Sequence, residues 1–255
     1  MSDPGPLAEP ISAPLEAPQD TEREPFWGWT DVALFAAGAP IVLAAVAVLI
    51  FAAGKTLHWR MDKAIGLLAM QGLLYLVAYG LLWLILIVRY SNGVWSALRW
   101  AVAPATGARL FAAGFALALA MGLLGLAFHT PTVDNPVMRL MRDPASILVV
   151  IVFASTLGPV AEEVVFRGFL QPVAIRTLGT IAGIAGTSLL FAALHGFEYQ
   201  WHWQYLLLVF IASCAFGWTR LRWNSTGAST LLHSGYNLMF FMGYLLQGRT
   251  SPPHG

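Results

Sequence analysis

The sequence contains few charged residues and almost no cysteine. Only 11% of its 255 residues are charged, whereas about a quarter of the residues of a typical soluble domain are charged. The single cysteine, Cys214, excludes both an internal disulfide bond and a metal site built from cysteines. A net charge of +1 gives no reason to expect a nucleic-acid partner.

Two motifs of familiar hydrolases are also missing. The chain has neither the GxSxG of a serine nucleophile on a strand–helix turn nor the HExxH of a zinc peptidase helix. No pair of aspartates lies inside an apolar stretch, because Asp134 and Asp143 fall in a loop and Asp31 and Asp62 at the ends of such stretches. If the protein is a hydrolase, its reactive groups must come from another combination of residues.

Long apolar stretches are abundant, since 58% of the residues are hydrophobic. A soluble fold of this length could not bury so many of them, and about twenty apolar residues in a helix are needed to cross a bilayer. We therefore predict an all-α, polytopic membrane helix bundle of about seven transmembrane helices. The predicted spans are 31–53, 64–88, 109–128, 146–170, 177–196, 203–220 and 228–247.

Composition divides the chain into four parts. Residues 1–25 are rich in proline and acid, lack the pattern of a secretory signal, and predict a disordered tail. Residues 26–145 are predicted to form about three membrane helices with their loops. Residues 146–247 contain about four spans and all the unusual polar groups, and residues 248–255 form a short tail. The distribution of Lys and Arg over the loops slightly favours a cytoplasmic amino terminus.

The stretch GPVAEEVVFRGFLQP places ionisable residues inside the fourth span. Glu163 and Arg167 are four apart, lie on one helix face and can pair, whereas Glu162 is rotated by about 100°. An ionised group at the bilayer centre costs roughly 2.5–3.5 kcal/mol, and such residues usually mark a functional site. The alternative is a structural salt bridge between helices. Gly158 and Pro159, just upstream, predict a kink.

Two further polar positions lie in later spans. His195 follows Phe191 by four residues near the end of the fifth span, and His233 and Asn237 share a face of the seventh span. Gly235 between them leaves room for another helix or a ligand. Each group alone could be interfacial or hydrogen-bonded packing, and Glu198 beside His195 is interpreted as part of a wet boundary loop.

Taken together, these side chains suit hydrolysis of a peptide bond. A carboxylate can act as general base on water, a histidine can orient or protonate, and amide or imidazole donors can stabilise an oxyanion. The same groups could instead hold a divalent metal such as Zn²⁺, with Glu162, His195 and His233 as the ligands and one position left for water.

The order EExxxR, FxxxH and HxxxN resembles the CPBP family of CAAX proteases and bacteriocin-processing enzymes, also called the Abi family. The matching residues are Glu162, Glu163, Arg167, Phe191, His195, His233 and Asn237. The motifs span residues 162–237, and nothing in the first three spans contributes to them.

The resemblance implies an intramembrane endopeptidase with a water-accessible site below the headgroups, in which Glu162 activates the attacking water. It implies that Glu163 and Arg167 hold the site together, and that His195, His233 and Asn237 orient water, stabilise the oxyanion or bind a metal. The expected partners are membrane lipid and a peptide or protein substrate, prenylated or embedded in the membrane. The expected location is the cytoplasmic membrane of a bacterium.

Two other functions fit the same residues. Buried Glu, Arg and His are common in proton-coupled transporters, although such folds often show paired repeats and none is visible here. A catalytically silent membrane scaffold or bacteriocin self-immunity protein is the other alternative. In the peptidase, Glu162 and His195 must lie within reach of one shared water.

Overall fold

The computed structural model describes residues 25–56, 63–90, 94–134, 136–141 and 144–250, and within these ranges it contains helices and no strands. The all-α prediction is therefore confirmed. The elements are α1 (Trp29–Thr56), α2 (Lys63–Tyr90), α3 (Val94–Ala97), α4 (Pro104–Ala127), α5 (Pro136–Leu140), α6 (Pro144–Val152), η1 (Phe153–Leu157), α7 (Gly158–Glu163), η2 (Val164–Leu170), α8 (Gln171–Leu178), α9 (Thr180–Leu194), α10 (Trp203–Trp223) and α11 (Thr226–Thr250). The predicted tail over residues 1–25 falls outside the described residues apart from Pro25.

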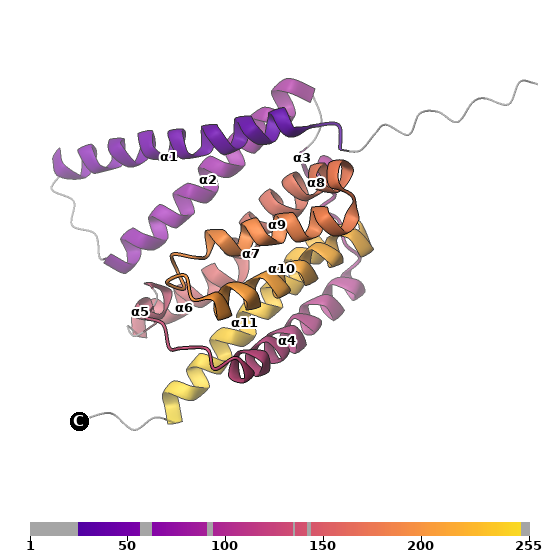
Figure 1. Ribbon diagram of the computed structural model, residues 1–255. Helices are drawn as coiled ribbons and strands as arrows, with labels where there is room; N and C mark the ends of the chain where they lie inside the picture. Colours follow the sequence, from indigo (N-terminus) through magenta and orange to yellow (C-terminus); the bar gives the residue numbers. More distant parts are fainter. Residues whose placement is uncertain (1–24, 57–62, 91–93, 135, 142–143, 251–255) are drawn as a thin grey trace, which may run out of the picture.

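Five described helical segments are long and apolar enough to cross a membrane. They are α1, the 69–90 part of α2, α4, the continuous helical segment 146–178, and α10. The two other predicted spans correspond to α9, which is shorter, and to α11, which is 25 residues long. In Figure 1, α1 and α2 lie on one side of the bundle, while α4 and α11 pack together on the other.

The segment that carries the acidic motif is one continuous helix with two wide turns, η1 and η2. A single residue separates each wide turn from a proline. The backbone N–H of Gly158, before Pro159, bonds to the carbonyl of Phe153, and that of Gln171, before Pro172, bonds to the carbonyl of Phe166. Because proline has no N–H and crowds the preceding turn, the i→i−4 pattern gives way to i→i−5 bonds. Such π-bulges are frequent at functional sites.

Glycines set the closest helix contacts. A Cβ on Gly114 of α4 would collide with the backbone of Leu232 in α11, and a Cβ on Gly235 of α11 would collide with the carbonyl of Phe111 in α4. In the same way, a Cβ on Gly183 of α9 would lie 2.7 Å from the backbone of Ile175 in α8. Small residues allow this close approach, as expected from the glycine-rich fifth span and from Gly235.

A buried apolar cluster joins the amino-terminal half to the motif-bearing helices. It contains Trp27, Leu82, Leu86, Leu98, Val164, Phe169 and Val173. Indole Nε1 of Trp27 also donates to the carbonyl oxygen of Phe169 at 2.9 Å. This cluster holds α2 against η2 and α8, and thereby brings one face of α2 to the polar site.

Candidate active site

The Glu163 carboxylate is the centre of the polar cluster. Its side chain is fully buried, and it accepts three hydrogen bonds from two helical segments. Arg167 Nη1 and His233 Nδ1 each lie 3.0 Å from Oε1, and the Ser229 hydroxyl donates to Oε2. A buried carboxylate is tolerated only when it is paired and hydrogen-bonded in this way. Glu163 is therefore a fixed acceptor that joins the acidic helix to α11.

Arg167 is the cation that balances Glu163. Its Nη2 donates to the Ser213 carbonyl oxygen at 2.9 Å and to the Ser213 hydroxyl at 2.6 Å. Its guanidinium lies 4.7 Å from the ring centre of Phe191 and 5.5 Å from that of Phe216. Aromatic faces stabilise a desolvated cation. The pair predicted from the four-residue spacing is thus present, and it links η2 to α9 and α10.

Glu162 has a different environment from its neighbour. Its side chain is 27% exposed, whereas that of Glu163 is fully buried. Its Oε2 lies 3.8 Å from Nε2 of His233, beyond direct hydrogen-bond distance. The 100° rotation between adjacent helical residues therefore leaves one carboxylate fixed inside the protein and the other accessible.

His233 lies between the two carboxylates. Because the Glu163 carboxylate can only accept, Nδ1 of His233 carries the proton of their hydrogen bond, and Nε2 is the atom that faces Glu162. The ring stacks on Phe216 with 4.3 Å between ring centres. The buried carboxylate thereby fixes both the tautomer and the ring orientation of His233.

His195 is oriented by the end of its own helix. Its Nδ1 lies 2.8 Å from the carbonyl oxygen of Phe191. A carbonyl can only accept, so Nδ1 is protonated and Nε2 of the neutral ring has a free lone pair. The Phe191 ring contacts both imidazoles, with ring centres 4.5 Å from His195 and 6.1 Å from His233. The FxxxH spacing thus both orients His195 and separates the two rings.

Glu198 lies closer to the site than its sequence setting suggested. It is half-buried, and it interacts electrostatically with both His195 and Glu162. Burial raises the pKa of the Glu198 carboxyl above its ordinary value of 4.5; His195 lowers this pKa in part, and the Glu162 carboxylate raises it further. An acid interpreted as part of a boundary loop therefore lies within electrostatic range of two of the predicted site residues.

Asn237 completes the predicted group. Its Nδ2 donates to the carbonyl oxygen of Ala154, in the wide turn η1, at 2.8 Å. Asn237 is one helical turn from His233 on α11, so both residues face the acidic helix. An amide nitrogen has two hydrogens, and the second can donate to a substrate. All six predicted catalytic residues lie on α7, η2 and α11 or directly after the end of α9, and these elements contact one another.

Several polar neighbours had no clear sequence signal. Tyr75 and Tyr79 of α2 lie within electrostatic range of Glu162, and the Tyr79 hydroxyl is buried without a hydrogen-bond partner. Their four-residue spacing places them on one face, but it is equally typical of packing. Ser229 precedes His233 by four residues, and this spacing is the one sequence signal that could have indicated that Ser229 belongs to the site.

The sequence also allowed a metal bound by Glu162, His195 and His233. Among the described residues, no group of three or more His, Cys, Asp or Glu side chains is arranged so that it could hold a metal ion. Nδ1 of each imidazole donates to a protein acceptor, as is also usual in metal-ligating histidines, so these hydrogen bonds leave Nε2 of both rings available. In the described structure the three predicted ligands are not gathered into a metal site, and the metal stays a prediction.

Comparison with known proteins agrees with the motif order. Residues 144–239 match the family described as "Type II CAAX prenyl endopeptidase Rce1-like". No curated protein and no solved structure matches the chain. The matched segment starts at α6, ends in α11, and contains every predicted catalytic residue. Over this segment the chain is similar to the Rce1-like family of CAAX proteases, in agreement with the resemblance of its motifs.

Proposed function

We propose that this protein is an intramembrane endopeptidase that hydrolyses a peptide bond with a water activated by Glu162. The observation that carries the proposal is the contrast between the two adjacent glutamates around His233. Glu163 is buried and saturated with hydrogen bonds, whereas Glu162 is partly exposed and 3.8 Å from the imidazole. One acid maintains the site, and the other is free to accept a proton.

In the first step, the water lies between the Glu162 carboxylate and Nε2 of His195. The carboxylate accepts one hydrogen, and the lone pair of the neutral imidazole accepts the other, so that an oxygen lone pair points at the substrate carbonyl. The water oxygen bonds to the carbonyl carbon while its proton moves to Glu162. General-base catalysis of this kind contributes about 10²–10⁴-fold.

The oxyanion formed by this attack needs hydrogen-bond donors that are already in place. The second amide hydrogen of Asn237 is one such donor, and Nε2 of His233, also on α11, becomes another when the ring carries both protons as an imidazolium. Glu163 supports the protonated form of His233, because its carboxylate accepts the Nδ1 hydrogen. The intermediate collapses when the C–N bond breaks and Glu162 returns its proton to the leaving amine.

We further propose that the substrate is the carboxyl-terminal CAAX segment of a prenylated protein. The family description supports a prenylated substrate. The aromatic side chains of Tyr75 and Tyr79 also lie within electrostatic range of Glu162, and such neighbours suit an apolar residue next to the scissile bond. A bacteriocin leader or another membrane segment would use the same chemistry.

The test is cleavage of a farnesylated CAAX peptide by the purified protein in detergent, with the unprenylated peptide in parallel. Glu162→Gln keeps the size of the side chain and should lower kcat by at least about 100-fold. Asp134→Asn removes an exposed acid in the α4–α5 loop and should leave kcat within about twofold. Equal cleavage by the parent and Glu162→Gln would refute the proposed base.

The transporter alternative makes the opposite prediction in the same preparation. Proton flux into vesicles that depends on Glu162, with no cleavage of either peptide, would replace the peptidase by a transporter. Cleavage with no flux supports the peptidase. A scaffold would show neither peptide cleavage nor proton flux, in the parent protein or in Glu162→Gln.

A further inference from the structure

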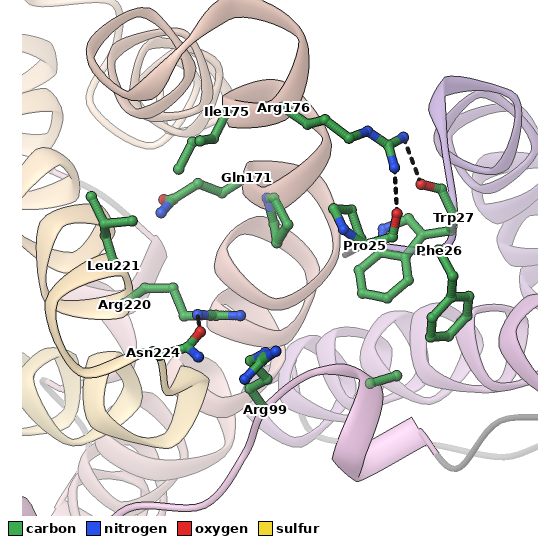
Figure 2. A pocket seen from close by; sticks show the side chains of 12 residues that line it. Pro25, Phe26, Trp27, Arg99, Gln171, Ile175, Arg176, Arg220, Leu221 and Asn224 are labelled. Carbon is green, nitrogen blue, oxygen red and sulfur yellow. Dashed lines mark hydrogen bonds between the residues drawn. The ribbon is translucent and has the colours of Figure 1, made fainter. Parts of the chain in front are cut away.

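The helix that precedes His195, α9, is held at its two ends in different ways. At its amino-terminal end it packs on α8. Arg176 of α8 donates in turn to the carbonyl oxygens of Pro25 and Trp27, as Figure 2 shows. This end is therefore tied to the segment before α1. His195 directly follows the other end of α9, so its position depends on a separate set of contacts.

The carboxyl-terminal end of α9 is followed by a ladder of stacked rings. The Tyr199 ring is nearly parallel to the His195 imidazole, with 6.5 Å between the ring centres and 17° between the planes. Tyr199 also stacks on Tyr205 of α10, at 4.8 Å and 11°. The Tyr205 hydroxyl donates to the carbonyl oxygen of Pro131, after α4, at 2.7 Å. Because offset stacking at such separations is favourable, the ladder connects His195 to α10 and to the α4–α5 loop.

The backbone between His195 and α10 has an unusual conformation. Gln200 and Trp201 both have positive φ, at 51° and 59°, which bulky residues rarely adopt unless their surroundings impose it. The Trp201 N–H donates to the Gly196 carbonyl at 2.8 Å, and a Cβ on Gly196 would lie 2.7 Å from the Trp201 ring. The Tyr199 N–H donates to the His195 carbonyl at 3.1 Å. These contacts fix the turn that presents Tyr199 to His195.

His195 needs this support because its own hydrogen bond does not fix the whole ring. The bond from Nδ1 to the Phe191 carbonyl, at 2.8 Å, sets the tautomer, but the ring can still tilt about it. Such a tilt would move Nε2, the atom that accepts from the water in the proposed reaction. A displacement of about 1 Å at a reacting group can cost about 100-fold in rate. A parallel ring beside the imidazole opposes the tilt.

Membrane anchoring does not explain Tyr199. Aromatic residues are enriched at the membrane–water boundary, and the neighbouring Phe197 and Trp201 are 84% and 54% exposed, as that role requires. Tyr199 is instead half-buried, and its ring contacts are with His195 and Tyr205. It also lies within electrostatic range of the carboxylate of Glu162. Tyr199 is therefore directed toward the candidate active site.

We propose that Tyr199 is a positioning residue for His195, which holds the imidazole so that Nε2 faces the attacking water, and that Tyr205 supports Tyr199 from α10. Tyr199 acts through its ring and not through its hydroxyl. This inference rests on the proposed peptidase function, in which His195 orients the water. A residue with this role contributes to kcat and leaves KM almost unchanged.

The test uses the full-length protein in detergent. Tyr199→Phe keeps the ring, whereas Tyr199→Leu removes it. Tyr244→Leu is the matched control, because Tyr244 is also half-buried but packs against the apolar cluster of Met141, Val150 and Phe241. One readout is kcat and KM for the farnesylated CAAX peptide. The other is the rate at which the Nδ1 hydrogen of His195 exchanges with water, measured by NMR with ¹⁵N-labelled histidine and assigned with His195→Gln.

We expect Tyr199→Leu to lower kcat and to accelerate the exchange at Nδ1, each at least about tenfold, with KM changed less than about twofold. Tyr199→Phe and Tyr244→Leu should stay within about twofold of the parent in all three quantities. If Tyr199→Leu fails to fold, Tyr205→Phe decides, because it keeps the ring and loses only the bond to Pro131; its kcat should fall at least about threefold. An unchanged kcat in the deciding variant, or an equal loss in Tyr199→Phe or Tyr244→Leu, overturns the proposal.

The two readouts distinguish failure of this proposal from failure of the proposed function. If the parent protein cleaves no peptide, the peptidase is refuted, and the exchange at Nδ1 of His195 alone decides whether Tyr199 positions the ring. Unchanged exchange in Tyr199→Leu overturns the positioning role in either case, because the imidazole would then be held without the Tyr199 ring.

Discussion

Replacing Arg167 with methionine should destabilise the protein strongly, because it leaves the Glu163 carboxylate buried without its cation. The Glu163 side chain is fully buried and that of Arg167 is 1% exposed. Breaking such a pair from one side costs about 3–5 kcal/mol. The substitution would also leave the Ser213 carbonyl and hydroxyl without the donor that Arg167 provides.

The double variant Arg167→Met/Glu163→Gln tests the reason for this loss. It removes both charges, so it should be more stable than Arg167→Met alone, with a coupling energy of about 2–3 kcal/mol, the upper range for residues in contact. Unfolding in mixed micelles, followed by the fluorescence of the ten tryptophans, measures the free energies.

The exposed ion pair between Arg139 and Asp134 provides the control. Their side chains are 54% and 49% exposed, and such pairs contribute less than about 1 kcal/mol, so Arg139→Met should have little effect. Additive losses for the Arg167 and Glu163 substitutions, or an Arg167→Met variant as stable as Arg139→Met, would refute the reasoning.

Three further predictions concern helix packing, pH and metal. Gly235→Ala should cost about 1–3 kcal/mol by overpacking against α4, whereas Gly243→Ala on the same helix, with nothing within 4 Å of the added Cβ, should not destabilise; equal thermal midpoints would contradict the close contact. Burial raises the pKa of the Glu198 carboxyl above 4.5. The contribution of the protonated carboxyl to stability is therefore present below pH 4.5 and is lost as the pH rises through the higher folded-state pKa. Glu198→Gln should remove this loss, and thermal midpoints of parent and variant that fall in parallel over this pH window would contradict it. If Glu162 activates the water without a metal, cleavage should survive dialysis against a chelator; loss that Zn²⁺ restores would show that the predicted metal is needed.

Much of the architecture could be predicted from hydrophobicity. Each of the seven predicted spans corresponds to a helix, since an apolar stretch in a bilayer has to satisfy its own backbone hydrogen bonds. Helix ends differed from the predicted bounds by up to eight residues; the helical segment predicted to end at 170, for example, continues to Leu178. Gly158 and Pro159 predicted a kink. The sequence does not show where i→i−5 hydrogen bonds form, so the two wide turns could not be predicted from it. The bacterial location stays a prediction.

The site was predictable where its geometry lies within one helix. The spacing of Glu163 and Arg167 predicted their pair, and the rotation of Glu162 predicted its different environment. The sequence could not show that Ser213 and Ser229 also bind this pair, because both contacts join residues that are distant in the chain. The approach of α2 and its tyrosines likewise depends on packing that no motif records.

The most direct test of the account compares Glu162→Gln with Glu163→Gln in one preparation, measuring both the thermal midpoint and peptide cleavage. The account predicts that Glu162→Gln keeps the midpoint of the parent protein and loses cleavage, whereas Glu163→Gln lowers the midpoint because buried Arg167 loses its carboxylate. The reverse pattern, with a normal midpoint in Glu163→Gln and full cleavage in Glu162→Gln, would contradict the assignment of separate roles to the two adjacent acids.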